Sequence, residues 1–421
     1  MLLSYLPKDF EQLAVHYRVL NTQWPNAKVT DARTLLRLIL LHVGADLPLR
    51  QTVALVAEGG GPKLTQVWLH KKMRRAQPYL AALVQRMVSD VERQATPERW
   101  AGYEMVCLDG STVSGPGAEG IDVRIHGVVR LHDLQVRDVR VTNVGEGETL
   151  RRFIWEPGQL VIVDRGYSNA PGIAWTVDHG ADVLVRVNRG ALPLYDAGSE
   201  LIDVLDWCRS LQGHRAVERA VKIACGAAKQ RRELSGRLIA FRLPDDEAKE
   251  ARERVRREEG PNVTLEHLEA AQYVVLFTTT PASRLSAARC IEAYRLRWQV
   301  ELQFKRWKSL CHFDRLPNYL DETMCSWLTA KVLLGLLLDR VGSGALTQSA
   351  TNRPLARQSW KLTSIIWPLI VSVLMPIRLA NAAEHVGAIV DYLDALDELR
   401  DPHQIESFRH RYYDNDGECA A

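Results

Sequence analysis

The sequence lacks paired cysteines, long apolar runs and a strong net charge. Its seven cysteines are odd in number and show no Cys-x-x-Cys spacing, which argues against a disulfide framework or a zinc site. The apolar stretches at 328–338 and 362–375 are shorter than the roughly 20 residues that a membrane helix needs. The apolar stretch at the N-terminus is too short for a signal peptide. We therefore expect a soluble, cytoplasmic protein that has no membrane partner.

The charged residues nearly balance, with 54 Lys and Arg against 51 Asp and Glu and a formal net charge of +3. This balance excludes a strongly basic field over the whole molecule. If the partner is nucleic acid, the cations must therefore gather on particular faces. At 421 residues the chain is too long for one simple core, and its length suggests about three domains.

The stretch 291–310 has the spacing of an amphipathic helix. Leu296, Val300, Phe304 and Trp307 recur at helical intervals and form an apolar stripe. The polar face of such a helix is usually a solvated surface with ion pairs between residues four apart. Here that face lies about a quarter-turn from the stripe and carries one carboxylate among cations and a tyrosine: Tyr294, Arg297, Glu301, Lys305 and Lys308.

Two aspartates each follow a short apolar run that reads as a buried strand. Asp109 precedes a glycine and ends the run 104–108, and Asp164 ends the run 159–163. Such an aspartate is usually a turn former. In an open α/β sheet, however, sites are built at the carboxyl ends of strands. Together with Glu301, these aspartates would form an all-oxygen cluster, which suits Mg²⁺ or Mn²⁺ better than zinc.

The three motifs resemble the signature of the insertion-sequence IS-four family of DDE transposases. They are Asp109-Gly, Asp164-x-Gly166-Tyr167, and a Tyr-Arg-Glu-Lys set at Tyr294, Arg297, Glu301 and Lys308. The three motifs occur in the family's order, and the spacing within the Tyr-Arg-Glu-Lys set matches the family's pattern. The resemblance extends from about residue 30 to about residue 330. It implies a multidomain α/β fold: a ribonuclease-H-like catalytic core, interrupted by a mainly β insertion and flanked by helical N- and C-terminal regions.

Local patterns divide the chain in keeping with that architecture. We expect a helical DNA-binding domain at 1–98, the first part of the core at 99–189, the β insertion at 190–272, the second part of the core with the Glu301 helix at 273–330, and a helical C-terminal domain at 331–421. An insertion is expected because one strand and one helix cannot use up the residues between Asp164 and Glu301. For the C-terminal domain, helix packing and dimerisation are both open.

Strands of the core are predicted at 104–109, 123–131, 137–142, 159–164 and 181–187, with a helix at 168–179. In the insertion, strands are predicted at 215–225 and 234–243, with a charged helix at 247–259. An apolar strand at 273–277 then leads back towards the Glu301 helix.

The N-terminal region has the order helix, glycine turn, basic helix. A helix at 31–43, with Thr30 as its N-cap, and another at 50–58 precede the glycines at 59–61 and a basic helix at 63–75. A helix-turn-helix protein of this order places its second helix in the major groove, whereas the alternative is a surface helix with a basic face. On the first interpretation, phosphates are held by Lys71, Lys72, Arg74 and Arg75, and bases are read by Thr65, Gln66 and His70.

The chemistry of the acidic cluster favours phosphodiester cleavage. Two divalent cations about 4 Å apart can activate a nucleophile and stabilise the leaving oxygen. We assign Asp109, Asp164 and Glu301 as the catalytic ligands of two Mg²⁺ ions, for which Mn²⁺ would substitute. Tyr294, Arg297, Lys305 and Lys308 would grip phosphates, and Trp298 would either touch DNA or pack.

By resemblance, the reaction is cut-and-paste transposition of an insertion sequence through a hairpin intermediate. The partners would be double-stranded DNA, as transposon terminal inverted repeats and as target, and a second copy of the chain in a synaptic complex. The setting would be a prokaryotic cytoplasm, with the protein at the nucleoid when DNA is bound.

Two alternatives remain open. One is a catalytically silent repressor that binds terminal repeats, and the acidic trio argues against it because carboxylates that bind no metal only repel one another. The other is a metal-dependent nuclease without strand transfer, which would not need the Tyr-Arg-Lys set or the large insertion.

Overall fold

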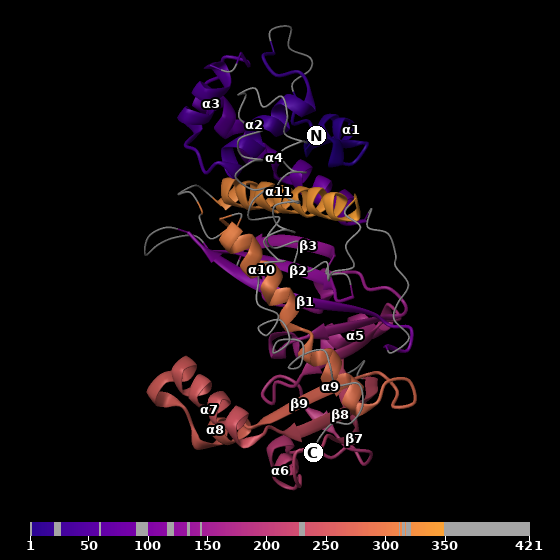
Figure 1. Cartoon of the computed structure of the whole chain (residues 1–421). Coiled ribbons are helices and arrows are strands. Elements are labelled where there is room, and N and C mark those ends of the chain that lie inside the picture. The colour runs from indigo at the N-terminus through magenta and orange to yellow at the C-terminus, as the bar shows by residue number, and fades with distance from the viewer. Residues whose placement is uncertain are drawn as a thin grey trace.

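The computed structural model is a mixed α/β structure in which a helical region lies at one end of a large sheet (Figure 1). The structure describes residues 2–20, 27–58, 60–89, 100–115, 122–132, 135–143, 145–226, 232–310, 312–313, 316 and 321–348. Of the C-terminal domain predicted at 331–421, residues from 349 onward therefore lie outside the described part.

The described strands form one nine-stranded sheet in the order β3-β2-β1-β4-β5-β9-β8-β7-β6. Its centre is parallel, because β1 pairs with β4 and β4 with β5 in the same direction, whereas the other pairs are antiparallel. The carboxyl ends of β1, β4 and β5 consequently point towards the same edge. The strands are β1 (Glu104–Ser114), β2 (Asp122–Arg130), β3 (Val136–Asn143), β4 (Gln159–Val163), β5 (Asp182–Arg186), β6 (Leu194–Tyr195), β7 (Val217–Cys225), β8 (Arg232–Arg242) and β9 (Tyr273–Thr278).

The strands predicted for the core and for the insertion are confirmed, with ends that shift by a few residues. One end differs in kind, because β1 does not stop at Asp109 but continues to Ser114. The reason is that β2 pairs with β1 along its whole length, with Asp109 opposite Gly127 and Ser114 opposite Asp122. Asp109 therefore lies within a long strand and not in the turn that an Asp-Gly pair suggests.

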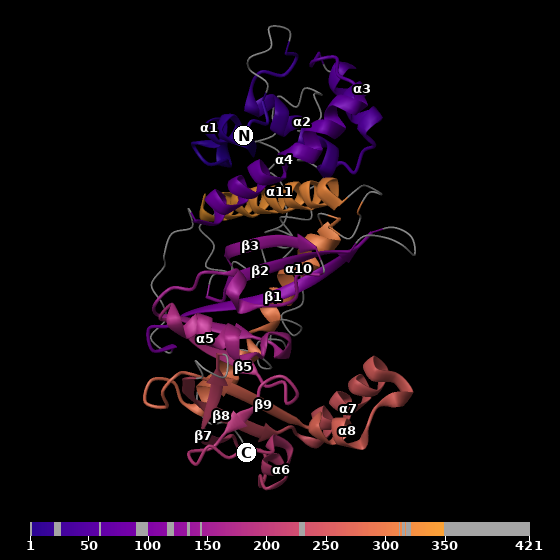
Figure 2. The ribbon, with the colours of Figure 1, turned by 180° about the vertical axis from the view of Figure 1, so that it is seen from behind.

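Both faces of the parallel centre are covered by helices, which explains its continuous apolar runs. Leu160 and Ile162 of β4 share a core with Val300 of α10 (Trp298–Leu310) on one face. Val161 and Val163 of the same strand share the other core with α5 (Ala170–Asp178), which Figure 2 shows from behind. The alternation of side chains along a strand thus places two separate cores around one sheet.

The helix predicted at 291–310 is wrong as one continuous element. The structure has two helices, α9 (Ala287–Arg295) and α10. At the junction, the backbone N–H groups of Leu296, Arg297 and Val300 donate to carbonyls three residues back, which tightens the turn. The break lets α9 pack on β4 while α10 packs on β1 and β2. The predicted apolar stripe is otherwise confirmed, since Val300, Phe304 and Trp307 are buried.

The N-terminal helices pack against a helix from much later in the chain. They are α1 (Phe10–His16), α2 (Ala32–Gly44), α3 (Leu49–Glu58) and α4 (Gln66–Ser89), and the later helix is α11 (Asp321–Gln348). In both views α11 lies between these helices and the sheet, and it contacts α2, α4 and β3 (Figures 1 and 2). Its Lys331 is buried and donates to Asp46 Oδ1 over 2.6 Å and to the His312 carbonyl over 2.7 Å.

Two details of the predicted N-terminal helices are corrected. The N-cap of α2 is Asp31 and not Thr30, because Asp31 Oδ1 accepts a hydrogen bond from the Thr34 N–H over 2.7 Å. The basic helix extends well beyond residue 75, to Ser89. Buried side chains such as Tyr79 and Leu83 continue its apolar face, and packing against α11 favours the longer helix.

The region 190–272 adds β6, β7 and β8 to the same sheet, together with α-helices. These are α6 (Val204–Arg209), α7 (Asp245–Glu259) and α8 (Leu265–Ala270), and Figure 1 shows α7 and α8 extending away from the strands. The predicted charged helix is α7. Among the helices that the structure describes, none has the combination of length and hydrophobicity needed to cross a bilayer. The cysteines in the described part of the chain form no disulfide.

Candidate active site

Two of the three predicted acidic residues come together because β1 and β4 are parallel neighbours. Their last register pair is Cys107 with Ile162, and Asp109 and Asp164 each follow two residues later. Asp164 caps a short 3₁₀ turn at Arg165–Tyr167, and its Oδ1 accepts from the Gly166 N–H over 2.9 Å. Asp109 Oδ1 accepts from its neighbouring backbone N–H over 2.8 Å. Backbone donors thus orient both carboxylates at one edge of the sheet.

Glu301 reaches the same edge from the first turn of α10. Arg297, at the junction of α9 and α10, links it to the sheet. Its Nη2 donates to Glu301 Oε1, and its Nη1 lies 3.6 Å from Asp109 Oδ2. The side chains of Asp109 and Arg297 are only 17% and 18% exposed, so this bridge is largely shielded from solvent.

The electrostatics of the site reflect crowded carboxylates. Burial raises the pKa of Asp109 to about 7, Arg297 opposes that rise, and the charges of Asp164 and Glu301 add to it. For Arg297 itself, burial acts to lower the pKa, but the neighbouring Tyr294 and Glu301 outweigh it and the pKa of the guanidinium is raised. The site therefore favours a positive charge among these residues.

The donor set fits a divalent cation. It consists of carboxylate oxygens, which are the ligands of Mg²⁺ and Mn²⁺. Arg297 already stands as a cation between Asp109 and Glu301. Within the described residues, no three side chains of His, Cys, Asp or Glu are yet arranged to hold a metal ion as they stand. The Arg297 guanidinium thus lies between two of the carboxylates that were predicted to hold a cation.

The other residues of the predicted Tyr-Arg-Glu-Lys set also gather near this edge. The Arg297 guanidinium lies 5.8 Å from the centre of the Tyr294 ring. Lys308 donates to the carbonyl of Thr112 over 3.0 Å, so it reaches the part of β1 that follows Asp109. Lys305 is exposed on α10. The break between α9 and α10 thus leaves the set on one side of the sheet.

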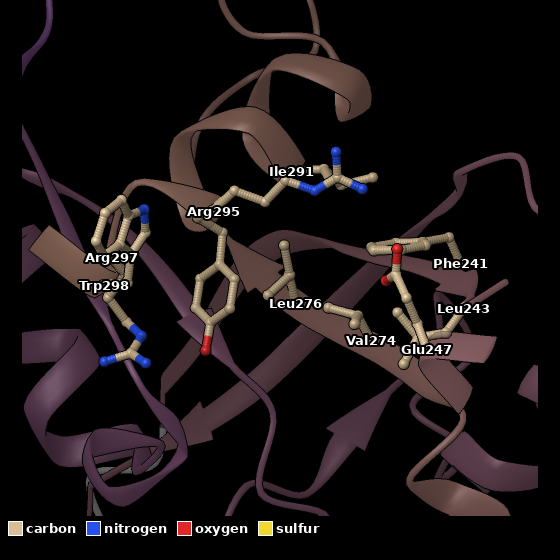
Figure 3. A pocket seen from close by; sticks show the side chains of 10 residues that line it. Phe241, Leu243, Glu247, Val274, Leu276, Ile291, Arg295, Arg297 and Trp298 are labelled. Carbon is tan, nitrogen blue, oxygen red and sulfur yellow. The ribbon is translucent and has the colours of Figure 1, made fainter. Parts of the chain in front are cut away.

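A cavity of about 250 Å³ opens beside this set, between α9, α10 and the strands β8 and β9. Trp298 is 38% exposed and lies with Arg297 at one end of the cavity, while Phe241 and Glu247 lie at the other (Figure 3). Trp298 therefore lines a cavity next to the acidic residues and is not packed in a core.

The predicted DNA contacts of the N-terminal region lie on the first part of α4, except Thr65, which directly precedes the helix. Most of them are exposed, and His70 is half-buried. Lys72 is half-buried too, and its Nζ donates to the Val19 carbonyl over 2.6 Å and lies 5.6 Å from the Trp68 ring centre. Thr65 accepts from the Trp68 N–H over 3.2 Å and so caps the helix. The exposed members are Thr65, Gln66, Lys71, Arg74 and Arg75.

The sequence patterns did not predict one acidic residue that lies beside the site. Glu148 lies in the loop before the 3₁₀ turn Leu150–Arg152, and its carboxylate oxygens approach both Gly110 and Gly166. The only local signal was that the loop is rich in glycine and glutamate. No spacing connects it to the three motifs, so the tertiary structure was needed to find it.

Comparisons with known proteins agree with the motifs. Residues 100–320 match the family model described as the transposase DDE domain. The chain is 32% identical over 319 residues to the putative transposase InsL for insertion sequence element IS186A of Escherichia coli strain K12, an alignment covering 75% of this chain and 86% of that protein. It is also 32% identical over 320 residues to the transposase for insertion sequence element IS421 of Escherichia coli, with the same coverage.

The chain therefore belongs to the DDE transposase family. This confirms the predicted transposase family and the assignment as a metal-dependent enzyme of DNA transposition. The mixed sheet with covering helices is consistent with the catalytic core of that family.

Proposed function

We propose that the enzyme performs cut-and-paste transposition with two Mg²⁺ ions held by Asp109, Asp164 and Glu301, on a ribonuclease-H-like core. When bound, such ions activate the attacking water or 3′-hydroxyl and stabilise the leaving oxygen. Mn²⁺ would substitute, because it takes the same oxygen ligands. The observation that carries this proposal is that Asp109 and Asp164 occupy neighbouring positions on parallel strands, and that Arg297 pairs with both Asp109 and Glu301.

Arg297 would hold the scissile phosphate. Its Nε is buried and has no hydrogen-bond acceptor among the described residues, and a phosphate oxygen would supply one. A guanidinium that turns from Glu301 to a phosphate keeps its charge paired and frees the carboxylate oxygens. Tyr294, Lys305 and Lys308 would bind neighbouring phosphates, and Trp298 would contact DNA beside the cavity.

The remaining regions would position the DNA. We assign end recognition to the helical region at 1–98, with α4 presenting its cations and base readers to the terminal inverted repeats. The core would comprise 99–189 and 273–330, the insertion 190–272 would cover the DNA end, and 331–421 would serve helix packing or dimerisation. Two ends must be cut and joined to target DNA together, so a homodimer in the synaptic complex is proposed.

The test uses purified full-length protein and a labelled duplex carrying the end of its own element, with Mg²⁺. The unmodified protein should cut the end and release a hairpin, and Asp109→Asn should bind the end without cutting it. Tight binding without cutting by the unmodified protein would instead favour a repressor. Cutting without joining to a supercoiled target plasmid would favour a nuclease.

A further inference from the structure

The two motif glycines beside the catalytic aspartates share one neighbour, the carboxylate of Glu148. A Cβ added to Gly110 would lie 3.2 Å from Glu148 Oε1, and one added to Gly166 would lie only 2.1 Å from Glu148 Oε2. The same point at Gly166 is 3.2 Å from Asp164 Oδ1. Because neither glycine carries a side chain, the Glu148 carboxylate fits between the two motifs and lies next to Asp164.

The chain holds Glu148 in that place from both sides. Before it, Arg152 donates to the carbonyls of Glu146 and Gly147, each over 3.2 Å. After it, Thr149 caps the next turn and Leu150 is fully buried. The carboxylate also lies 3.7 Å from Arg124 Nη1. A loop fixed by this many contacts presents its side chain in a defined position.

Stabilising the fold does not explain this placement. Two carboxylates that share one small space repel each other unless a cation lies nearby. Arg124 offers one distant ion pair, and the Glu148 side chain is 30% exposed, so that pair contributes little. The arrangement becomes favourable when a cation bound by Asp164 adds positive charge, and water on that cation can donate to Glu148.

We propose that Glu148 is a positioning residue of the metal site, which orients Asp164 and increases the affinity for the divalent ions. This inference rests on the proposed function of Asp109, Asp164 and Glu301 as metal ligands. Glu148 would act through Asp164 and through water around a bound ion.

The test measures Mn²⁺ affinity of the full-length protein without DNA, by electron paramagnetic resonance, beside thermal melting of the metal-free protein. Glu148→Gln keeps the shape of the side chain and removes its charge. It should weaken Mn²⁺ binding about tenfold, as loss of an outer-shell partner does, and leave the melting temperature unchanged or higher. Unchanged Mn²⁺ affinity with a lower melting temperature would overturn the proposal, because that pattern belongs to a purely structural residue.

A second variant moves the carboxylate without changing the charge. The backbone of Gly166 is not left-handed, so Gly166→Ala adds only the contact with Glu148 and Asp164. It should weaken Mn²⁺ binding to a similar extent, and the double variant with Glu148→Gln should be no weaker than either change alone. Fully additive losses would show that the two residues act independently and would overturn the proposal.

Two further variants separate this inference from the function on which it rests. Glu146→Gln lies in the same loop and pairs with Arg152, and it should leave Mn²⁺ affinity unchanged. Asp164→Asn should weaken it more than Glu148→Gln does. If Asp164→Asn binds Mn²⁺ more weakly and Glu148→Gln does not, the inference alone fails. If neither changes the affinity, the metal assignment itself fails.

Discussion

The acidic residues on the sheet and the cations on α4 differ in how the chain assembles them. Asp109, Asp164, Arg297 and Glu301 come from three distant segments and interact with one another, and the side chains of Asp109 and Arg297 are largely shielded. Lys71, Arg74 and Arg75 come from one helix and are exposed. The effects of mutating charges in contact are coupled, whereas exposed charges on a helix are screened by solvent and their mutational effects are almost independent. We therefore expect large, coupled losses in the first region and small, additive losses in the second.

The largest expected effect is that of Glu301→Gln. The change keeps the shape of the side chain and removes one metal ligand, so cleavage of end DNA should fall on the order of 10³-fold or more, while binding of the end persists. A cleavage assay beside a gel-shift titration checks this. Glu292→Gln is the matched control, because Glu292 lies on α9 and pairs with Arg289, and that variant should cut normally. Near-normal cleavage by Glu301→Gln would remove Glu301 from the metal site.

Arg297→Gln should separate two roles of one residue. Cleavage should fall on the order of 10²-fold, because a donor to the reacting phosphate is lost. Mn²⁺ binding without DNA should become tighter, because the guanidinium no longer occupies the space between Asp109 and Glu301. Arg295→Gln, an exposed neighbour, serves as the control for Mn²⁺ affinity. Weaker Mn²⁺ binding by Arg297→Gln would mean that the guanidinium assembles the carboxylates and does not compete with the ion.

The cations of α4 should show smaller and additive effects. Alanine at Lys71, Arg74 or Arg75 should each weaken end binding several-fold and reduce the slope of log affinity against log salt by about one. Lys72→Ala should instead lower the melting temperature, because Lys72 is bonded to the Val19 carbonyl. Salt-dependent binding titrations with all four variants check this. If only Lys72→Ala reduced the salt slope by about one, phosphate binding would be assigned to Lys72 and not to the exposed cations.

The smallest expected effect concerns acid stability of the helical region. His42 on α2 is buried, lies 3.2 Å from Thr52 Oγ1 and packs edge-on against Trp327 of α11. Burial lowers its pKa to about 4, and the charge of Lys331 adds to that effect. The unfolded chain takes up this proton at about pH 6.5 and the folded chain does not, so stability falls as pH falls from 6.5 towards 4.

At pH 5.5 that loss amounts to about 1 kcal/mol. Urea unfolding at pH 7.0 and 5.5 should show it, and His42→Asn should reduce the difference by that amount. His16→Asn, on the exposed surface of α1, is the control and should keep the full difference. An equal pH dependence in the protein and in His42→Asn would mean that other groups carry it.

Local patterns predicted much of the fold because the central strands are buried on both faces and the helices on one. Apolar runs marked β4 and β5, and the i, i+4 spacing marked the buried face of α10. The break between α9 and α10 was not predictable in this way. Its residues are compatible with a continuous helix, and packing on two different parts of the sheet decides the bend.

The sequence by itself determined the three motifs, their order and the oxygen chemistry of the site, because these depend on residue types and on spacing along one element. Tertiary structure alone decided that Asp109 lies inside a strand, that Arg297 stands between Asp109 and Glu301, and that Glu148 fills the space beside two glycines. These contacts join residues that no local period relates. They depend on the strand register and on the crossing of α10 over the sheet, which only the packed molecule specifies.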